Sequence, residues 1–190
     1  MTTPCVDLLF IQGAGAGAHE ADQVLADALG QALGRDFRVH FPRMPDEGAP
    51  DNDVWKQAIS TALRRTRATF LVAHSAAGAV VADLLAQGGD GAAELGPLTA
   101  IMLLAPPFVG AGGWQLDGFH LDQPSAADAA APPPLHLYFG LADQTVPPAH
   151  AELYGRRFKA AVIHRLPGCG HQFEGWTAQL ARDLRALAPA

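Results

Sequence analysis

Apolar residues in this chain gather into short continuous runs, and longer stretches with helical spacing separate these runs. The runs predict six strands, at residues 6–11, 37–41, 69–73, 99–105, 135–140 and 161–165. Most runs are apolar at nearly every position, and only residues 37–41 alternate regularly between apolar and polar. Strands without alternation have both faces buried, which is typical of a parallel sheet between two layers of helices.

Between these strands the spacing predicts five helices, over about 19–33, 51–63, 76–87, 149–158 and 174–187. The expected buried face of the first helix consists of Val24, Leu25, Ala28, Leu29 and Leu33. Residues 108–134 are rich in Gly, Ala, Asp and Pro and show no firm period. Since no repeat or linker interrupts the alternation, we predict one α/β domain over residues 1–190, a three-layer α/β/α sandwich around a mostly parallel six-stranded sheet.

Composition narrows the class of protein. A chain of 190 residues that is 49% hydrophobic can build one sizeable core. The net charge of −6, with no basic block, argues against a nucleic-acid partner. Without a signal-peptide pattern or a membrane-length apolar run, we expect a cytoplasmic protein with no membrane partner, and a homodimer is left open. Cys5 and Cys169 are too few for a disulfide framework and lack zinc-type spacing, so no metal is expected.

The strand at residues 69–73 leads directly into His74-Ser75, and small residues then open a helix. Strand, sharp turn, serine and helix are the layout of a nucleophile elbow, whose usual pattern is Gly-x-Ser-x-Gly. Both glycines are alanine in this chain, at Ala73 and Ala77. The alternative is that Ser75 simply caps the helix, since serine is a preferred N-cap residue.

A serine hydroxyl needs a base to take its proton and an acid to orient that base. Asp143 follows the fifth strand and His171 follows the sixth, each at the carboxyl end where ligands bind in such sheets. The chain order Ser75, Asp143, His171 is the order of α/β-hydrolase triads. Three other aspartates follow the fourth strand and are alternative acids without the turn context of Asp143: Asp117, Asp122 and Asp128.

With these residues, the whole chain resembles a small, lid-poor α/β-hydrolase. The matching segments are residues 12–15, 74–75, 140–147 and 170–171. More narrowly, the chain length and Met44-Pro45-Asp46 followed by Trp55 resemble the compact serine hydrolases of the retinoblastoma-binding protein nine type. The resemblance implies strand order 2-1-3-4-5-6, with the serine at the end of the central strand. The chain departs from the pattern at the two elbow alanines and at Gln12, where many members have histidine.

The resulting hypothesis is a serine hydrolase that cleaves a small ester, amide or thioester through an acyl-enzyme intermediate. The N–H groups of Ala14 and Ala76 are expected to form the oxyanion hole. An apolar wall for the substrate is expected from Phe108, Trp114 and Phe173. No cofactor is expected.

Two other functions fit the same stretches. Residues 13–18 also match Gly-x-Gly-x-x-Gly/Ala after a strand, which is the fingerprint of a dinucleotide-binding site. Such a site needs a carboxylate at the end of the second strand to bind the ribose, and this chain has none there. Arg43 could instead bind a 2′-phosphate. A protein with this fold could also bind a partner without turning it over. His74 and Cys169 are interpreted as structural residues. His19 either begins the first helix, which is the favoured interpretation, or lines the cleft after the glycine-rich loop.

Overall fold

The computed structural model describes residues 5–88, 93, 95–119, 121 and 133–188. At its centre is a six-stranded sheet in the order β2-β1-β3-β4-β5-β6, with every neighbouring pair parallel. The strands are β1 (Val6–Ile11), β2 (Phe37–His40), β3 (Phe70–His74), β4 (Ala100–Leu104), β5 (Leu135–Gly140) and β6 (Val162–Leu166). This confirms both the fold class and the strand order that the family resemblance implied.

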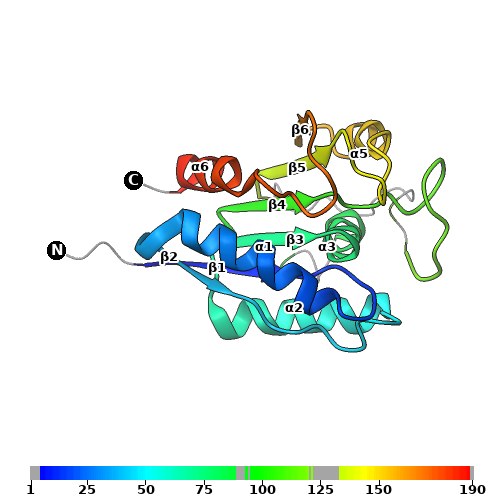
Figure 1. Cartoon of the computed structure of the whole chain (residues 1–190). Helices are drawn as coiled ribbons and strands as arrows, with labels where there is room; N and C mark the ends of the chain where they lie inside the picture. Colours follow the sequence, from blue (N-terminus) through cyan, green and yellow to red (C-terminus); the bar gives the residue numbers. More distant parts are fainter. Residues whose placement is uncertain (1–4, 89–92, 94, 120, 122–132, 189–190) are drawn as a thin grey trace.

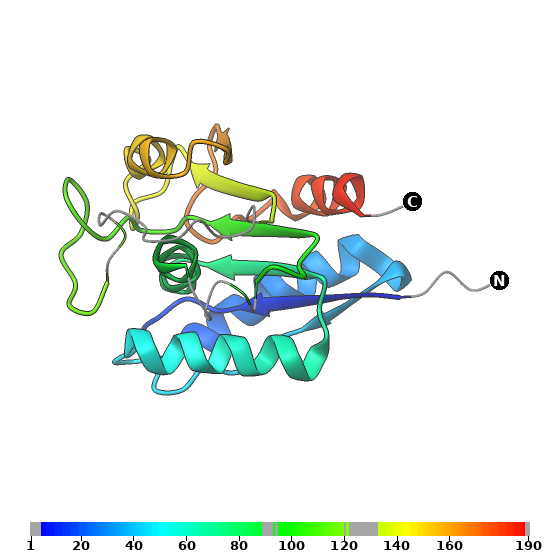
Figure 2. The same ribbon diagram turned by 180° about the vertical axis from the view of Figure 1, so that it is seen from behind.

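Helices cover both faces of the sheet, as Figures 1 and 2 show from opposite sides. The helices are α1 (Ala18–Leu33), α2 (Asn52–Thr66), α3 (Ala76–Gln87), α5 (His150–Arg157) and α6 (Thr177–Leu187). The core residues of α1 and α6 belong to one hydrophobic cluster, and those of α2, α3 and α5 to the other. Within the described parts of the chain, every helix is too short or too polar to cross a bilayer. The cytoplasmic location stays a prediction.

The two clusters explain why the strand runs are apolar at successive positions. On β3, Leu71 and Ala73 face the cluster of α2, α3 and α5, whereas Phe70 and Val72 face the cluster of α1 and α6. All four side chains are almost completely buried. Side chains alternate between the two faces of a strand, so a strand covered on both sides needs apolar residues at each position.

The first helix differs from its expected pattern at Val24, which is 72% exposed. The buried stripe of α1 is formed instead by Leu25, Ala26, Leu29, Leu33 and one carboxylate, Asp22. Of the predicted face, Leu25, Leu29 and Leu33 are buried and Ala28 is half-buried, because spacings of three and four residues place side chains on one side of a helix. Asp22 is therefore a charged residue in a position that the helix buries.

The loops after β1, β3, β4, β5 and β6 leave the sheet at one edge, where parallel strands have their carboxyl ends. The loop after β4 extends beyond the body of the fold, and its described part carries a bridge between Val109 and Trp114 (Figure 1). Asp122 and Asp128, two of the alternative acids, lie outside the described residues.

Candidate active site

Ser75 stands in the turn between β3 and α3 with a positive φ, at φ 52° and ψ −123°. A non-glycine residue with this φ is strained, and such strain is typical of a nucleophile elbow. The main chain holds the turn in place, because Ser75 N–H donates to Leu104 O at 2.8 Å and Gly78 N–H donates to Ser75 O at 2.9 Å. The hydroxyl makes no capping bond to α3, so the alternative of a simple helix cap does not describe this serine.

The alanines in place of the elbow glycines are both fully buried. The position without room for a methyl group is Gly78, one residue further along α3. A Cβ at Gly78 would lie 2.9 Å from the Cβ of Pro106, which follows β4. The close approach of α3 to the neighbouring loop therefore depends on Gly78 rather than on residue 77.

The structure brings Ser75, His171 and Asp143 together from three loops. His171 Nε2 lies 3.1 Å from Ser75 Oγ, and His171 Nδ1 lies 2.8 Å from Asp143 Oδ2. The imidazole can therefore accept the serine proton at Nε2 while Nδ1–H donates to the carboxylate. The Asp143 side chain is 1% exposed and that of His171 is 16% exposed, so the carboxylate is buried and the imidazole is partly accessible to solvent.

Asp143 is held by its own turn as well as by the histidine. Its Oδ1 accepts from Thr145 N–H at 2.7 Å and from Val146 N–H at 2.9 Å, which leaves Oδ2 for His171. Burial by itself raises the pKa of Asp143. The hydrogen bonds from His171, Val146 and Thr145 outweigh burial and hold the pKa below its ordinary value. The carboxylate is thus ionised and fixed in orientation.

Gly140 lets the acid loop and the histidine loop meet. A Cβ at Gly140 would lie 2.3 Å from Cys169 O, a distance that no side chain tolerates. Ala142 N–H donates to the same oxygen at 2.9 Å, which ties the two loops together just before Asp143 and His171. The Cys169 side chain is buried, and burial raises the pKa of its thiol to about 11, so it is a packed neutral residue.

The glycine-rich loop after β1 passes directly beside the nucleophile. A Cβ at Gly13 would lie 3.0 Å from Ser75 Cβ and 3.6 Å from its Oγ. Gly13 N–H donates to Asp22 Oδ2 at 2.7 Å, and Gly15 N–H donates to Glu47 O at 2.7 Å.

Ala14 lies between these two bonded amides, and its own N–H has no partner within the described part of the chain. Ala76 N–H, at the first position of α3, is likewise without an acceptor among the described residues. The first N–H groups of a helix have no partner inside the helix and point out of its end. Ala14 on the glycine-rich loop and Ala76 at the start of α3 are thus two N–H donors without an acceptor among the described residues.

Glu47 anchors the glycine-rich loop, a role that the sequence did not reveal. Its carboxylate accepts from Gly17 N–H at 3.2 Å and from His19 N–H at 3.1 Å, at the start of α1. Arg43, the residue suggested for a 2′-phosphate, is paired with Glu20 and Glu47. A carboxylate therefore occupies the helix N-terminus at which a dinucleotide would place its pyrophosphate, which counts against the dinucleotide hypothesis.

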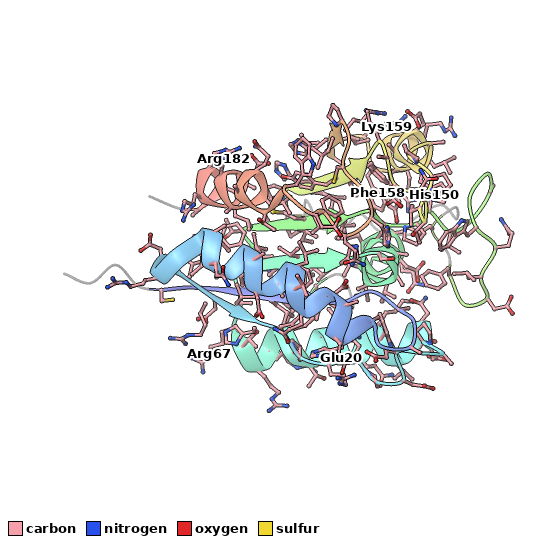
Figure 3. The ribbon with its side chains drawn as sticks, in the orientation of Figure 1. Glu20, Arg67, His150, Phe158, Lys159 and Arg182 are labelled. Carbon is pink, nitrogen blue, oxygen red and sulfur yellow. The ribbon has the colours of Figure 1, made fainter. Side chains whose placement is uncertain are left out.

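The expected substrate wall is not assembled as the sequence suggested. Phe173 is 0% exposed and Phe108 is 5% exposed, so both pack in the core and offer no surface to a substrate. Trp114 is 37% exposed and packs edge-on against His150, with the ring centroids 5.9 Å apart. His150 Nδ1 accepts from Phe108 N–H at 2.8 Å, and Figure 3 shows His150 beside the loop after β4. Trp114 is the only one of the three with an exposed ring.

The surface also carries an open cleft of about 800 Å³ between β2 and α2. Its lining includes Asp7, Arg38, His40 and Arg65, and none of Ser75, Asp143 or His171. His40 and Arg38 both contact the Asp7 carboxylate, at 2.7 and 3.6 Å. The cleft is thus separate from the triad.

The described residues contain no group of three or more His, Cys, Asp or Glu side chains that could hold a metal ion. The side chains at the sheet edge instead provide a hydroxyl, an imidazole and a carboxylate in series, with two free amides nearby. This arrangement can activate a hydroxyl nucleophile and stabilise a negative oxygen.

Comparisons with solved structures agree with this architecture. XC6422 from Xanthomonas campestris, an a/b serine hydrolase without lid, superposes with a TM-score of 0.65 at 21% identity, over 97% of this chain and 83% of that one. Est1E from Butyrivibrio proteoclasticus gives 0.65 at 13% identity, over 97% and 87%. Esterase PE8 gives 0.62 at 16% identity, over 97% and 93%. At these identities the likeness shows the α/β-hydrolase fold.

A search among curated proteins returns no match. A comparison with protein families matches residues 26–180 to the family described as serine hydrolase. This segment runs from the middle of α1 to α6 and includes Ser75, Asp143 and His171. The chain belongs to the serine hydrolase family.

Proposed function

We propose that this protein hydrolyses small esters through a Ser75-His171-Asp143 triad and an acyl-enzyme intermediate. The observation that carries the proposal is the distance of 3.1 Å between His171 Nε2 and the hydroxyl oxygen of Ser75, whose backbone is strained at a positive φ. The family match and the esterases among the structural neighbours support the reaction class.

In the first half-reaction, Ser75 Oγ attacks the acyl carbonyl carbon as His171 Nε2 takes its proton. Asp143 stays ionised, accepts from Nδ1–H and stabilises the imidazolium that forms. The N–H groups of Ala14 and Ala76 bind the oxyanion of the tetrahedral intermediate. His171 then protonates the leaving alcohol, and the acyl group remains on Ser75.

In the second half-reaction, His171 takes a proton from water, which attacks the acyl carbonyl carbon. The second tetrahedral intermediate uses the same two amides, and its collapse returns the proton to Ser75 and releases the acid. Trp114 is exposed on the loop after β4, which follows the strand beside β3. An exposed aromatic ring favours a small apolar group on the substrate.

A fluorophosphonate probe tests the nucleophile, because it reacts with activated serines. We expect the wild-type protein to be labelled and Ser75→Ala to remain unlabelled. Failure of the wild type to react would leave a non-catalytic binding protein as the better hypothesis. Hydrolysis of p-nitrophenyl esters of increasing chain length then defines the acyl preference, and Trp114→Ala shows whether this ring contributes to it.

A further inference from the structure

A second carboxylate and a second histidine lie behind the triad, and the proposed mechanism does not use them. Asp22 is 2% exposed and His74 is 1% exposed. Asp22 Oδ2 accepts from His74 Nδ1 at 2.7 Å and from Gly13 N–H at 2.7 Å. One buried oxygen thus joins helix α1, strand β3 and the glycine-rich loop.

The other ring nitrogen of His74 extends this connection to the histidine loop. His74 Nε2 lies 3.0 Å from the main-chain oxygen of His171, and the centroids of the two imidazole rings are 4.8 Å apart. A carbonyl oxygen only accepts hydrogen bonds, and an ionised carboxylate only accepts as well. Both nitrogens of His74 therefore face acceptors, and both contacts are hydrogen bonds when each nitrogen carries a proton.

An ionised Asp22 is consistent with a doubly protonated His74. Burial by itself raises the pKa of Asp22, but the hydrogen bond and charge of His74, together with the Gly13 N–H, outweigh burial and lower the pKa below its ordinary value. An ionised Asp22 requires Nδ1–H of His74 as its donor, and Nε2–H is already needed for the carbonyl of His171.

We propose that Asp22 and His74 form a buried carboxylate–imidazolium pair that positions the two halves of the active site relative to Ser75. On one side the pair holds Gly13, whose neighbour Ala14 supplies an oxyanion donor. On the other side it holds the main chain of the catalytic histidine. His74 itself directly precedes the nucleophile. This proposal rests on the proposed function, because positioning matters only where Ser75 reacts.

Stability alone gives no reason for such a pair. Replacing a buried ion pair by apolar residues is often neutral or stabilising, because desolvation offsets the Coulombic attraction. Both charges here are almost fully buried, and each one makes a further hydrogen bond to a loop of the site. The geometry thus assigns Asp22 and His74 the role of positioning residues.

Asp22→Asn tests the pair, since it keeps the volume and removes the charge. Asp27→Asn is the matched control on the same helix, where an exposed carboxylate accepts from Gln23. We expect Asp22→Asn to lower kcat by about 10²-fold with little change in KM, because small displacements at a reacting centre act on the transition state. Asp27→Asn should leave both constants unchanged.

His74→Gln has an equally close control in His40→Gln. His40 Nε2 and Asp7 Oδ1 form a histidine–aspartate contact of the same 2.7 Å length outside the site. We expect His74→Gln to lower kcat and His40→Gln to leave it unchanged. Loss of thermal stability in Asp22→Asn or His74→Gln, with kcat equal to that of the controls, would overturn the positioning role.

The wild type provides a readout that needs no variant to fold. Long-range ¹H–¹⁵N spectra at neutral pH should show protons on both ring nitrogens of His74, and a neutral His74 would overturn the ion pair. The two proposals fail separately. Absence of fluorophosphonate labelling in the wild type removes the proposed function, whereas normal labelling with equal kcat for Asp22→Asn and Asp27→Asn removes only the positioning proposal.

Discussion

Replacement of Asp143 by asparagine tests the triad through the tautomer of His171. Two main-chain N–H groups, of Thr145 and Val146, hold Oδ1 of the carboxylate. An asparagine would keep its oxygen on these donors and so turn its amide –NH₂ toward His171 Nδ1. That nitrogen would then have to accept, and the proton would move to Nε2, the atom that must receive the proton of Ser75.

The size of the effect follows from this tautomer. A Ser-His-Asp triad with the wrong tautomer loses about 10⁴ in kcat. This loss corresponds to about 5.4 kcal/mol of transition-state stabilisation, at 1.36 kcal/mol for each factor of ten. KM should change little, since the carboxylate touches the histidine and not the substrate.

Steady-state hydrolysis of a p-nitrophenyl ester measures the loss, and Asp117→Asn is the control. Asp117 lies on the loop after β4, is exposed, and is the one alternative acid within the described residues. We expect Asp117→Asn to retain wild-type kcat. Near-normal activity of Asp143→Asn, or a large loss in Asp117→Asn, would refute the assignment of the acid.

Asp143→Asn should also reduce the loss of unfolding free energy at acidic pH. The pKa of Asp143 in the folded protein lies below its ordinary value of 3.8, so the unfolded chain binds the proton more readily. Stability from this group is therefore fully present above about pH 4 and is lost as the pH falls through the lowered folded value. Denaturant unfolding between neutral and acidic pH should show a smaller acid loss for Asp143→Asn than for the wild type. An unchanged slope would contradict the lowered pKa.

Four further predictions follow from the burial and packing of individual side chains. Gly13→Ala places a methyl group 3.0 Å from the Cβ of the nucleophile, and kcat in the ester assay should fall by about 10²-fold while the fold is retained. Phe173→Ala should cost about 3–5 kcal/mol in the free energy of unfolding because its ring is fully buried, whereas Trp114→Ala should raise KM and leave the melting temperature unchanged. Cys5 is exposed, whereas Cys169 is buried and its pKa is raised to about 11. A thiol reagent at mildly alkaline pH should therefore modify only Cys5 in the native protein. Rapid modification of both cysteines would contradict the burial of Cys169.

The sheet could be predicted because its signal is local. Each strand is a continuous apolar run, and the run is continuous because both faces of the sheet are covered. Once the sheet is known to be parallel, all carboxyl ends lie at one edge. Ser75, Asp143 and His171 could then be grouped without any contact being visible in the sequence, since each follows a strand by only a few residues.

Asp22 and Glu47 were not predicted as site residues because each contacts residues far away in the sequence and binds main-chain N–H groups. Asp22 contacts His74, which is 52 positions away, and Glu47 reaches Gly17 across 30 positions. Neither pairing has a fixed spacing that a pattern could reveal. One feature of the sequence could have indicated Asp22, because it stands three residues before Leu25 on the buried stripe of α1. A carboxylate on an apolar stripe needs a buried partner, and this was the available signal.

The prediction that Phe108 and Phe173 line the substrate site was wrong for a related reason. Phe108 and Phe173 follow strands at the reactive edge, and proximity to that edge suggested a binding surface. Chain position gives the edge but not the direction of the side chain. The backbone of Phe173 is left-handed, at φ 56°, and its ring packs in the cluster of α1 and α6, edge-on to His74 at 6.2 Å. A buried aromatic ring against His74 supports the site from beneath rather than lining it.

The elbow alanines show what the glycine pattern represents physically. The turn requires a positive φ at the nucleophile, and Ser75 adopts this φ although Ala73 and Ala77 replace the two glycines. It also requires that α3 can approach the neighbouring loop, and that contact falls on Gly78 against Pro106. A methyl group at residues 73 and 77 points into the cluster of α2, α3 and α5 and is packed there. In this chain, which departs from Gly-x-Ser-x-Gly, the tight contact thus lies at residue 78 instead of residue 77, and the strained turn at the serine is kept. The motif is therefore better recognised by the close backbone contacts that it requires than by its two glycines.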